Sequence, residues 1–216
     1  MMDSNEKKDI VDGTVYRYSS DWIHELESEL HWRYYWFQQH LMQKRIKPGD
    51  QVLEIGPGTH FTANYLQSKG VEVTTVDIDA EKKPDIVANI VSWEWPQSWD
   101  HILAFEVLEH IPFIKVKQLL EIMKNHARKN LFLSVPVSEY RLFRCEWSLP
   151  LIGRHVLDLT IPRKRILAMH HFWEMGLFNR SKKELESLFQ QSGYNITESK
   201  KVWSLHYWVL QIEERA

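Results

Sequence analysis

The sequence predicts an α/β fold: a doubly wound, mostly parallel sheet of seven strands, with helices on both faces and an antiparallel C-terminal hairpin. A β-branched and leucine run that stops at a glycine turn, residues 52–58, opens the pattern. Strand-length and helix-period segments then alternate as far as residue 135, and two strand-like runs cover residues 194–200 and 206–213. Strands separated by helices pair in parallel, whereas strands joined by a short turn pair antiparallel.

Length and composition indicate one globular domain. The chain has 216 residues, of which 44% are hydrophobic and 26% charged, and its formal net charge is −2. This charge gives no general attraction to nucleic acid, so no DNA partner is expected. The single cysteine, Cys145, excludes an internal disulfide and a multi-cysteine metal site, which suits a cytoplasmic protein. We find no secretory signal and no apolar run long enough to span a membrane.

The segment around Gly56 has the form of a ligand-binding turn. Residues 52–55 read as a buried strand, and Gly56 and Gly58 allow a sharp turn and a close approach of the backbone to a ligand. Thr59 is placed to cap the helix that follows. A strand, turn and helix start of this kind holds a nucleotide-like ligand at the carboxyl edge of a sheet.

The other elements follow from apolar spacing and from start and stop signals. Residues 1–12 are expected to be frayed, and a helix is predicted over residues 22–45. A third helix begins at about Phe113, and Ser181 with Glu184 forms a capping box for the last one. The remaining core strands are predicted at residues 71–76, 85–90, 101–105 and 130–135.

We divide this single domain into four segments: an N-terminal helical segment (1–47), a ligand-binding core (48–135), an insertion (136–177) and a closing helix with hairpin (178–216). The insertion fits the strand and helix alternation poorly. Connections this long inside a compact domain are usually functional loops or lids, so we expect a lid over the substrate. Its basic cluster, residues 163–165, is either a solvated turn or a contact to a phosphate or carboxylate on the acceptor.

Asp77 narrows the class of ligand. It ends the predicted strand 71–76, about 20 residues past the glycine turn, where nucleotide binders place a carboxylate that accepts hydrogen bonds from ribose hydroxyls. A dinucleotide turn needs a small third residue in G-x-G-x-x-G, and this chain has Phe61 there. The pattern therefore argues against NAD(P) and for another nucleoside-like ligand.

Three motifs in this order resemble those of the class I S-adenosylmethionine-dependent methyltransferases. Residues 52–59 are similar to the family's first motif, Asp77 to its second-strand acid, and residues 105–111, with their Val-Leu-Glu-His sequence, to the fourth-strand motif of a broad small-molecule group. The resemblance is strongest over residues 50–135, and it implies a Rossmann-like fold with S-adenosyl-L-methionine as cofactor. His60 is a departure, because the family often has glycine there; its side chain would crowd the cofactor or form part of the acceptor pocket.

The resemblance also implies which residues hold the cofactor. Glu54 would help to hold its ammonium group, and Asp77 would bind both ribose hydroxyls. The other implied positions are Gly56, Pro57 and Gly58 in the turn, Ile78, Asn89 and Ile90 around the adenine, and Phe105 and Glu106 on the methionine side.

The acceptor is expected just beyond the fourth strand. His110 lies near the expected methyl group, so it is the candidate general base; the other interpretation is a helix-start residue that shapes the pocket. We expect His171, Trp173 and Glu174 to line the acceptor pocket from the insertion. His170, His171 and Glu174 carry metal-binding groups, but no metal site is predicted, because the adjacent histidines project differently on any regular element.

These features predict methyl transfer to an oxygen or nitrogen of a small-molecule acceptor, by a monomer or homodimer. An RNA or protein acceptor is the first alternative, supported only by the basic insertion; strong salt dependence of RNA binding would favour it. A non-catalytic cofactor-binding protein is the second, with His60 as its one hint. A dehydrogenase is a distant alternative that titration with NADH would settle.

Overall fold

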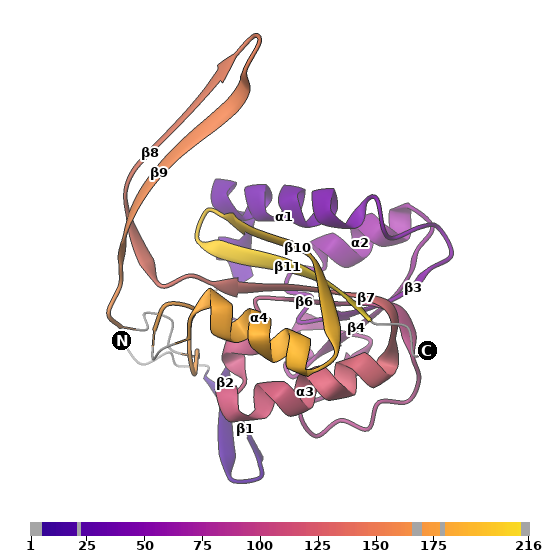
Figure 1. Cartoon of the computed structure of the whole chain (residues 1–216). Helices are drawn as coiled ribbons and strands as arrows, with labels where there is room; N and C mark the ends of the chain where they lie inside the picture. The colour runs from indigo at the N-terminus through magenta and orange to yellow at the C-terminus, as the bar shows by residue number, and fades with distance from the viewer. Residues whose placement is uncertain (1–5, 21–22, 166–169, 178–179, 213–216) are drawn as a thin grey trace.

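The computed structural model describes residues 6–20, 23–165, 170–177 and 180–212 of the chain (Figure 1). Its centre is a seven-stranded sheet in the order β10-β11-β7-β6-β3-β4-β5. The strands from β3 to β7 run parallel, while β11 is antiparallel to both β7 and β10. The predicted sheet is therefore confirmed. Its strands are β3 Gln51–Ile55, β4 Glu72–Asp77, β5 Ile86–Val87, β6 Trp99–Phe105, β7 Ala127–Pro136, β10 Tyr194–Val202 and β11 Leu205–Ile212.

Alternate residues of the central strands point to opposite faces of the sheet, which therefore separates two apolar cores. In β6, Ile102 and Ala104 pack into one core and Leu103 into the other. The four long helices cover both cores, as predicted (Figure 1). On the first face lie α3 Phe113–His126 and α4 Lys182–Gln191, and on the second α1 Glu29–Met42 and α2 Phe61–Ser68.

The strand order places a ligand-binding edge between β3 and β6. The chain leaves β3 toward β4 and β5 on one side, then crosses to β6 and β7 on the other. Open α/β sheets bind ligands at the carboxyl ends of strands where the order reverses in this way. Short 3₁₀ helices lie close to that edge: η1 Ile23–Glu27, η2 Ala80–Lys82 and η3 Leu108–His110.

The N-terminal residues form a hairpin, which corrects the expectation of a frayed segment. Strands β1 Lys7–Val11 and β2 Thr14–Tyr18 pair across a turn in which Asp12 and Gly13 have φ of 50° and 73°. Asp-Gly is a strong signal for such a turn, because both central residues need positive φ. The predicted helix over residues 22–45 is instead split into η1 and α1, and Trp22 lies outside the described residues.

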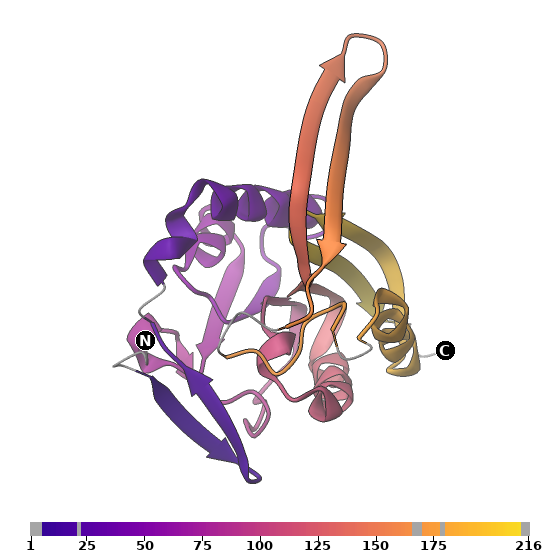
Figure 2. The ribbon, with the colours of Figure 1, turned by 90° about the vertical axis from the view of Figure 1, so that its left-hand side faces the viewer.

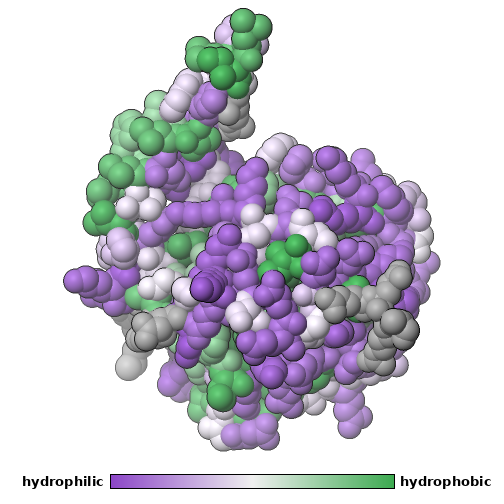
Figure 3. Space-filling view, in the orientation of Figure 1, coloured by the Kyte–Doolittle hydropathy of each residue, from purple (hydrophilic) through white to green (hydrophobic). Residues whose placement is uncertain are grey.

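A second hairpin projects away from the body of the molecule (Figures 1 and 2), formed by β8 Glu139–Leu149 and β9 Gly153–Pro162. Cross-strand pairing gives it two different faces. Phe143 stands opposite Leu159, whereas Arg144 stands opposite Asp158 and forms an ion pair with it. Its apolar side chains are exposed, as the green surface in Figure 3 shows: Phe143, Trp147, Leu149, Leu151, Ile152, Leu157 and Leu159. We call this element the projecting hairpin.

No helix in the described part of the chain combines the length and the apolar character that a membrane crossing requires.

Candidate functional site

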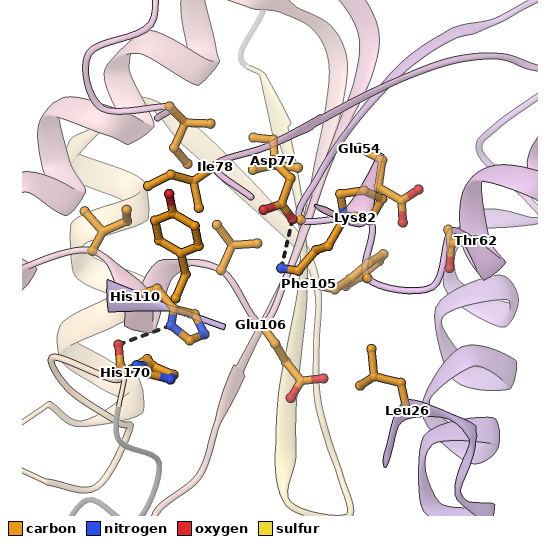
Figure 4. A pocket seen from close by; sticks show the side chains of 18 of the residues that line it. Leu26, Glu54, Thr62, Asp77, Ile78, Lys82, Phe105, Glu106, His110 and His170 are labelled. Carbon is orange, nitrogen blue, oxygen red and sulfur yellow. Dashed lines mark hydrogen bonds and ion pairs between the residues drawn. The ribbon is translucent and has the colours of Figure 1, made fainter. Parts of the chain in front are cut away.

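A cavity of about 560 Å³ lies at the carboxyl edge of the parallel strands (Figure 4). Its walls come from the ends of β3, β4 and β6, from the N-terminal hairpin, from α1 and from residues 170–171. The structure brings together at this cavity the cofactor residues expected from the sequence and two of the expected acceptor residues: Glu54, Gly56, Pro57, Gly58, Asp77, Ile78, Asn89, Ile90, Phe105, Glu106, His110 and His171.

The turn after β3 depends on its two glycines. Gly56 has a φ of 70°, and a Cβ added there would lie 3.1 Å from the Val107 side chain. Gly58 has a φ of 53°, and a Cβ there would lie 3.0 Å from Leu26. Left-handed backbone and close neighbours both exclude larger residues. The expected cap is wrong: α2 begins after His60, not Thr59, with no side-chain capping bond.

Asp77, at the end of β4, is buried and has two partners. One carboxylate oxygen accepts a hydrogen bond from the backbone amide of Asp79 at 2.8 Å. The other lies 3.1 Å from the ammonium of Lys82, the contact dashed in Figure 4. Lys82 belongs to η2 and lines the same cavity. Sequence reasoning missed it, because no motif or spacing marks this lysine.

Burial favours the neutral form of two further carboxyl groups in the cavity wall. Burial raises the pKa of Glu54 to about 8, although the backbone amide of Ala63 donates a hydrogen bond that opposes this rise. Burial also raises the pKa of Glu106 to about 7. Neither carboxyl has an ion-pair partner among the described residues. A cationic ligand in this cavity would restore both charges.

Glu106 also has a strained backbone. Its φ is 55°, which is uncommon for a residue with a side chain and is concentrated at functional sites. The conformation is fixed because the backbone amide of Glu106 donates to both the carbonyl and the hydroxyl oxygen of Ser134 on β7, at 3.0 and 3.1 Å. The turn after β6 therefore directs this residue to the wall of the cavity.

The N-terminal hairpin closes one side of the cavity and is tied to the sheet edge by side chains. Asp9 accepts a hydrogen bond from the Asn89 amide at 2.9 Å. The buried carboxylate of Asp79 accepts from Lys7 at 2.8 Å and from Ser20 at 2.5 Å. Sequence analysis missed this wall. The missed lining residues from the hairpin and α1 are Tyr16, Arg17, Tyr18, Ser19, His31, Tyr34, Tyr35 and Gln38.

At the other end of the cavity two histidine rings meet edge to face. The ring centroids of His110 and His171 are 4.7 Å apart, with an interplanar angle of 86°. His110 Nδ1 lies 3.2 Å from the backbone oxygen of His170, and His171 Nδ1 lies 3.0 Å from a carboxylate oxygen of Glu174. Burial, with the neighbouring His171, lowers the pKa of His110 to about 3, so its imidazole is neutral at pH 7.

Three of the residues expected in the acceptor pocket do not line the cavity. His60 turns toward η2, where its Nε2 donates to the backbone oxygen of Lys82 at 2.6 Å. Trp173 is a core residue whose indole N–H donates to the backbone oxygen of Ile111 at 2.9 Å. Glu174 is buried behind His171 and forms an ion pair with Arg163. These corrections share one cause, because sequence position does not determine which way a loop side chain points.

The insertion also differs from the expected lid. No described residue of the projecting hairpin lines the cavity; of the residues of the insertion that the structure describes, only His170 and His171 reach it. In the basic cluster 163–165, Arg163 is engaged inside the protein with Ser138 and Glu174. Neither of the two interpretations offered for that cluster therefore applies to Arg163.

Comparisons with known proteins agree with this architecture. Residues 30–199 match a family model described as a methyltransferase domain. Among solved structures, a SAM-dependent methyltransferase from Aquifex aeolicus is 15% identical with a TM-score of 0.61, over 91% of this chain and 100% of that chain. Magnesium protoporphyrin IX methyltransferase from Synechocystis PCC 6803, with bound SAM, is 11% identical with a TM-score of 0.57, over 89% and 85%.

A glycopeptide N-methyltransferase in complex with S-adenosylhomocysteine is 11% identical with a TM-score of 0.54, over 81% of this chain and 88% of that chain. At these identities the solved structures establish the fold. A search of curated proteins finds no match.

Proposed function

The chain belongs to the methyltransferase-domain family, as its motifs indicated, and we propose that it transfers a methyl group from S-adenosylmethionine to an oxygen or nitrogen of a small molecule. One observation carries the proposal. The cavity at the strand-order reversal places the carboxyl groups of Glu54, Asp77 and Glu106 around one ligand volume. A nucleoside that carries an ammonium and a sulfonium group suits such a site, whereas a pyrophosphate does not.

The cofactor residues take the roles that the resemblance implies. Asp77 accepts hydrogen bonds from both ribose hydroxyls, which then replace its contact with the Lys82 ammonium. Glu54 ionises on binding and holds the cofactor's ammonium group. Gly56 and Gly58 keep Cβ atoms away from the ligand. Ile78, Asn89 and Ile90 surround the adenine, and Pro57, Phe105 and Glu106 complete the wall beside the ribose and methionine.

Methyl transfer requires an acceptor lone pair in line with the bond between sulfur and the methyl carbon. As the new bond to carbon forms, the carbon–sulfur bond breaks and its electron pair returns to sulfur, which becomes a neutral thioether. A proton from the acceptor O–H or N–H passes to solvent. Because the methyl group is already activated, positioning of the two reactants supplies most of the catalysis.

His110 suits the orientation of the acceptor better than removal of its proton. A pKa of about 3 makes this imidazole a weak base at pH 7. Its Nδ1 faces the backbone oxygen of His170, which only accepts, so Nδ1 carries the hydrogen and Nε2 the lone pair. The neutral imidazole can therefore accept a hydrogen bond at Nε2 from a hydroxyl or an amine of the substrate. We therefore assign His110 and His171 to the acceptor side as binding residues.

A small acceptor is favoured because one cavity of about 560 Å³ must hold the cofactor and the acceptor together. The two alternatives lose part of their support. Arg141 and Arg144 of the basic insertion both pair with Asp158, and Arg163 pairs with Glu174, so these three arginines are engaged within the protein, whereas Lys164 and Arg165 are exposed. His60, the one hint of a non-catalytic protein, turns away from the cavity.

Isothermal titration with S-adenosylmethionine tests the cofactor half of the proposal. Asp77→Ala should weaken binding by about 100-fold, because two hydrogen bonds to a charged acceptor are lost. Asp100→Ala is the matched control, since Asp100 pairs with Lys129 outside the cavity and should leave the affinity unchanged. No binding to the unmodified protein, or equal affinities for both variants, would contradict the proposal.

The acceptor half is tested by measuring S-adenosylhomocysteine formation against a panel of phenols, hydroxylated acids and amines. Turnover of one class, with no turnover of RNA or protein at low salt, supports a small-molecule acceptor. Cofactor binding without turnover of any class in the panel counts against it.

A further inference from the structure

A cluster of three metal-binding residue types lies beside the cavity. Glu109 and His110 come from η3, and His171 follows the projecting hairpin in the chain. Each of the three offers one ligand atom, and these atoms all lie within 4.8 Å of one another. His110 and His171 also line the cavity, so an ion between them would face the ligand volume.

In both histidines the hydrogen bond uses Nδ1, so the other ring nitrogen, Nε2, is the one available to an ion. His110 Nδ1 lies 3.2 Å from the backbone oxygen of His170, and His171 Nδ1 lies 3.0 Å from a carboxylate oxygen of Glu174. Both oxygens are acceptors, so each Nδ1 carries a hydrogen and Nε2 is the ring nitrogen left to bind an ion. Metal-binding histidines are held in this way, with the second nitrogen donating to a carbonyl or carboxylate oxygen.

Glu109 supplies a second, independent observation. Its side chain is fully buried, and neither carboxylate oxygen has a hydrogen-bond partner among the described residues outside Glu109 itself. An unpaired buried carboxyl group is costly, and native structures rarely keep one without a partner. A cation at this point would provide that partner.

We propose that Glu109, His110 and His171 bind a divalent transition-metal ion at the acceptor end of the cavity. Two imidazole nitrogens and one carboxylate oxygen suit Zn²⁺, Co²⁺, Mn²⁺ or Fe²⁺. Glu174, held by Arg163, orients His171 from behind. The expectation of no metal site considered His170, His171 and Glu174; the structure instead groups His171 with the Glu109-His110 pair.

An ion held by Glu109, His110 and His171 would occupy the Nε2 atom that His110 otherwise offers to the acceptor, so the acceptor would bind to the ion instead. A hydroxyl bound to the ion would lose its proton to solvent more readily, and its oxygen would be held for attack on the methyl group. This second step rests on the proposed function, whereas metal binding itself does not. An acceptor with a hydroxyl, or with two adjacent oxygens, is the class that such a site favours.

Titration of the full-length, chelator-treated protein with Co²⁺ tests the site, because bound Co²⁺ is detected by its visible absorption. We expect one ion per chain, displaced by Zn²⁺. Glu109→Gln and His171→Ala should each weaken Co²⁺ binding at least tenfold, and Glu174→Gln should weaken it about tenfold through His171. His126, the last residue of α3, does not line the cavity and provides the control His126→Ala, which should leave the affinity unchanged.

Affinity for S-adenosylmethionine, measured on the same samples, shows that each variant is folded and separates the two proposals. Cofactor binding without a stoichiometric Co²⁺ site overturns the metal proposal alone. Co²⁺ binding that responds to Glu109 and His171 supports it, even if no acceptor is turned over. A Co²⁺ affinity that falls with His170→Ala but not with Glu109→Gln would overturn the assigned ligands, and Glu109→Asp replaces Glu109→Gln if the latter does not fold.

Discussion

The cavity and the projecting hairpin depart from the usual distribution of side chains in opposite directions. In the cavity region, Glu54 and Glu109 are buried with oxygens that lack partners among the described residues. On the hairpin, Trp147 is 42% exposed and Leu151 is 100% exposed. Buried polar groups are normally hydrogen-bonded, and large apolar surfaces are normally covered. The first departure fits bound cations, whereas nothing in the described protein covers the second.

The two regions also differ in what supports them. Segments far apart in the chain form the cavity wall, and seven paired strands hold them in place. The projecting hairpin is held by its own cross-strand pairs and, at its base, by Arg141 and Arg144 over the Trp203 ring. Changes at the cavity should therefore alter ligand binding, and changes along the hairpin should remain local.

The largest expected difference in cofactor affinity between the two regions comes from replacing a glycine with valine. Gly56→Val combines left-handed backbone with a Cβ that lies 3.1 Å from Val107, and together these cost enough to weaken S-adenosylmethionine binding by about 100-fold. Gly153→Val in the projecting hairpin is the matched control. Gly153 has a similar φ of 79° but no atom within 4 Å of an added Cβ. Titration should show unchanged affinity there, and equal losses would refute the contrast.

The sequence predicts some site residues better than others, and the difference depends on whether a local motif marks the residue. Gly56, Gly58, Asp77 and Glu106 were predicted from local motifs, and all four line the cavity. Their arrangement around one cavity then follows from the fold. The assignment failed for Trp173 and Glu174, which lie in an irregular segment where no periodicity fixes the direction of a side chain.

Contacts between distant segments left no signal at all. Asn89 was predicted beside the adenine, but its bond to Asp9 joins residues 80 positions apart, and no local pattern encodes such a pair. Lys82 was missed for a different reason, because it lies only five residues from Asp77 but no motif marks it. The N-terminal hairpin was predictable in part, since its Asp12-Gly13 turn is visible in the sequence and the strand charges obscured it. Burial of Glu109 could be known only from the packed structure.

A second difference is the response to pH. In the free protein the pKa of Glu54 is about 8 and that of Glu106 about 7, both raised by burial. A cationic ligand binds the ionised carboxyls, so below these pKa values binding must release protons. Affinity for S-adenosylmethionine should therefore rise at least about tenfold from pH 6 to pH 8. Titration at pH 6 in two buffers of different ionisation enthalpy should detect the released protons.

Glu54→Gln tests the source of that pH dependence, since an amide has no carboxyl proton to release. The increase of S-adenosylmethionine affinity with pH should become smaller in this variant. Asp158→Asn, in the projecting hairpin, should leave the pH dependence unchanged. An affinity that stays constant from pH 6 to pH 8 in the unmodified protein would be incompatible with neutral Glu54 and Glu106 in the free state.

A smaller effect is expected where the N-terminal hairpin is attached. Asp79→Asn removes the charge that accepts from Lys7 and Ser20, at a cost of about 1 to 3 kcal/mol. The wall that contains Tyr16 and Tyr18 should loosen, so that cofactor affinity falls a few-fold and the melting temperature falls by several degrees. Asp12→Asn, in the exposed turn of the same hairpin, should change neither quantity. Unchanged melting of Asp79→Asn would contradict this attachment.

The smallest expected effect comes from shortening the projecting hairpin. Residues 146–156 can be replaced by Asn-Gly, because Cys145 and Leu157 are paired across the strands and a two-residue turn can join them. The change keeps Arg144 and its contact with Trp203. Cofactor affinity should stay within about twofold and the melting temperature within about 3 °C, since no removed residue touches the cavity. Binding of an apolar dye should fall, because Trp147 and Leu151 are removed. A fivefold loss of cofactor affinity would instead mean that the distal hairpin supports the site.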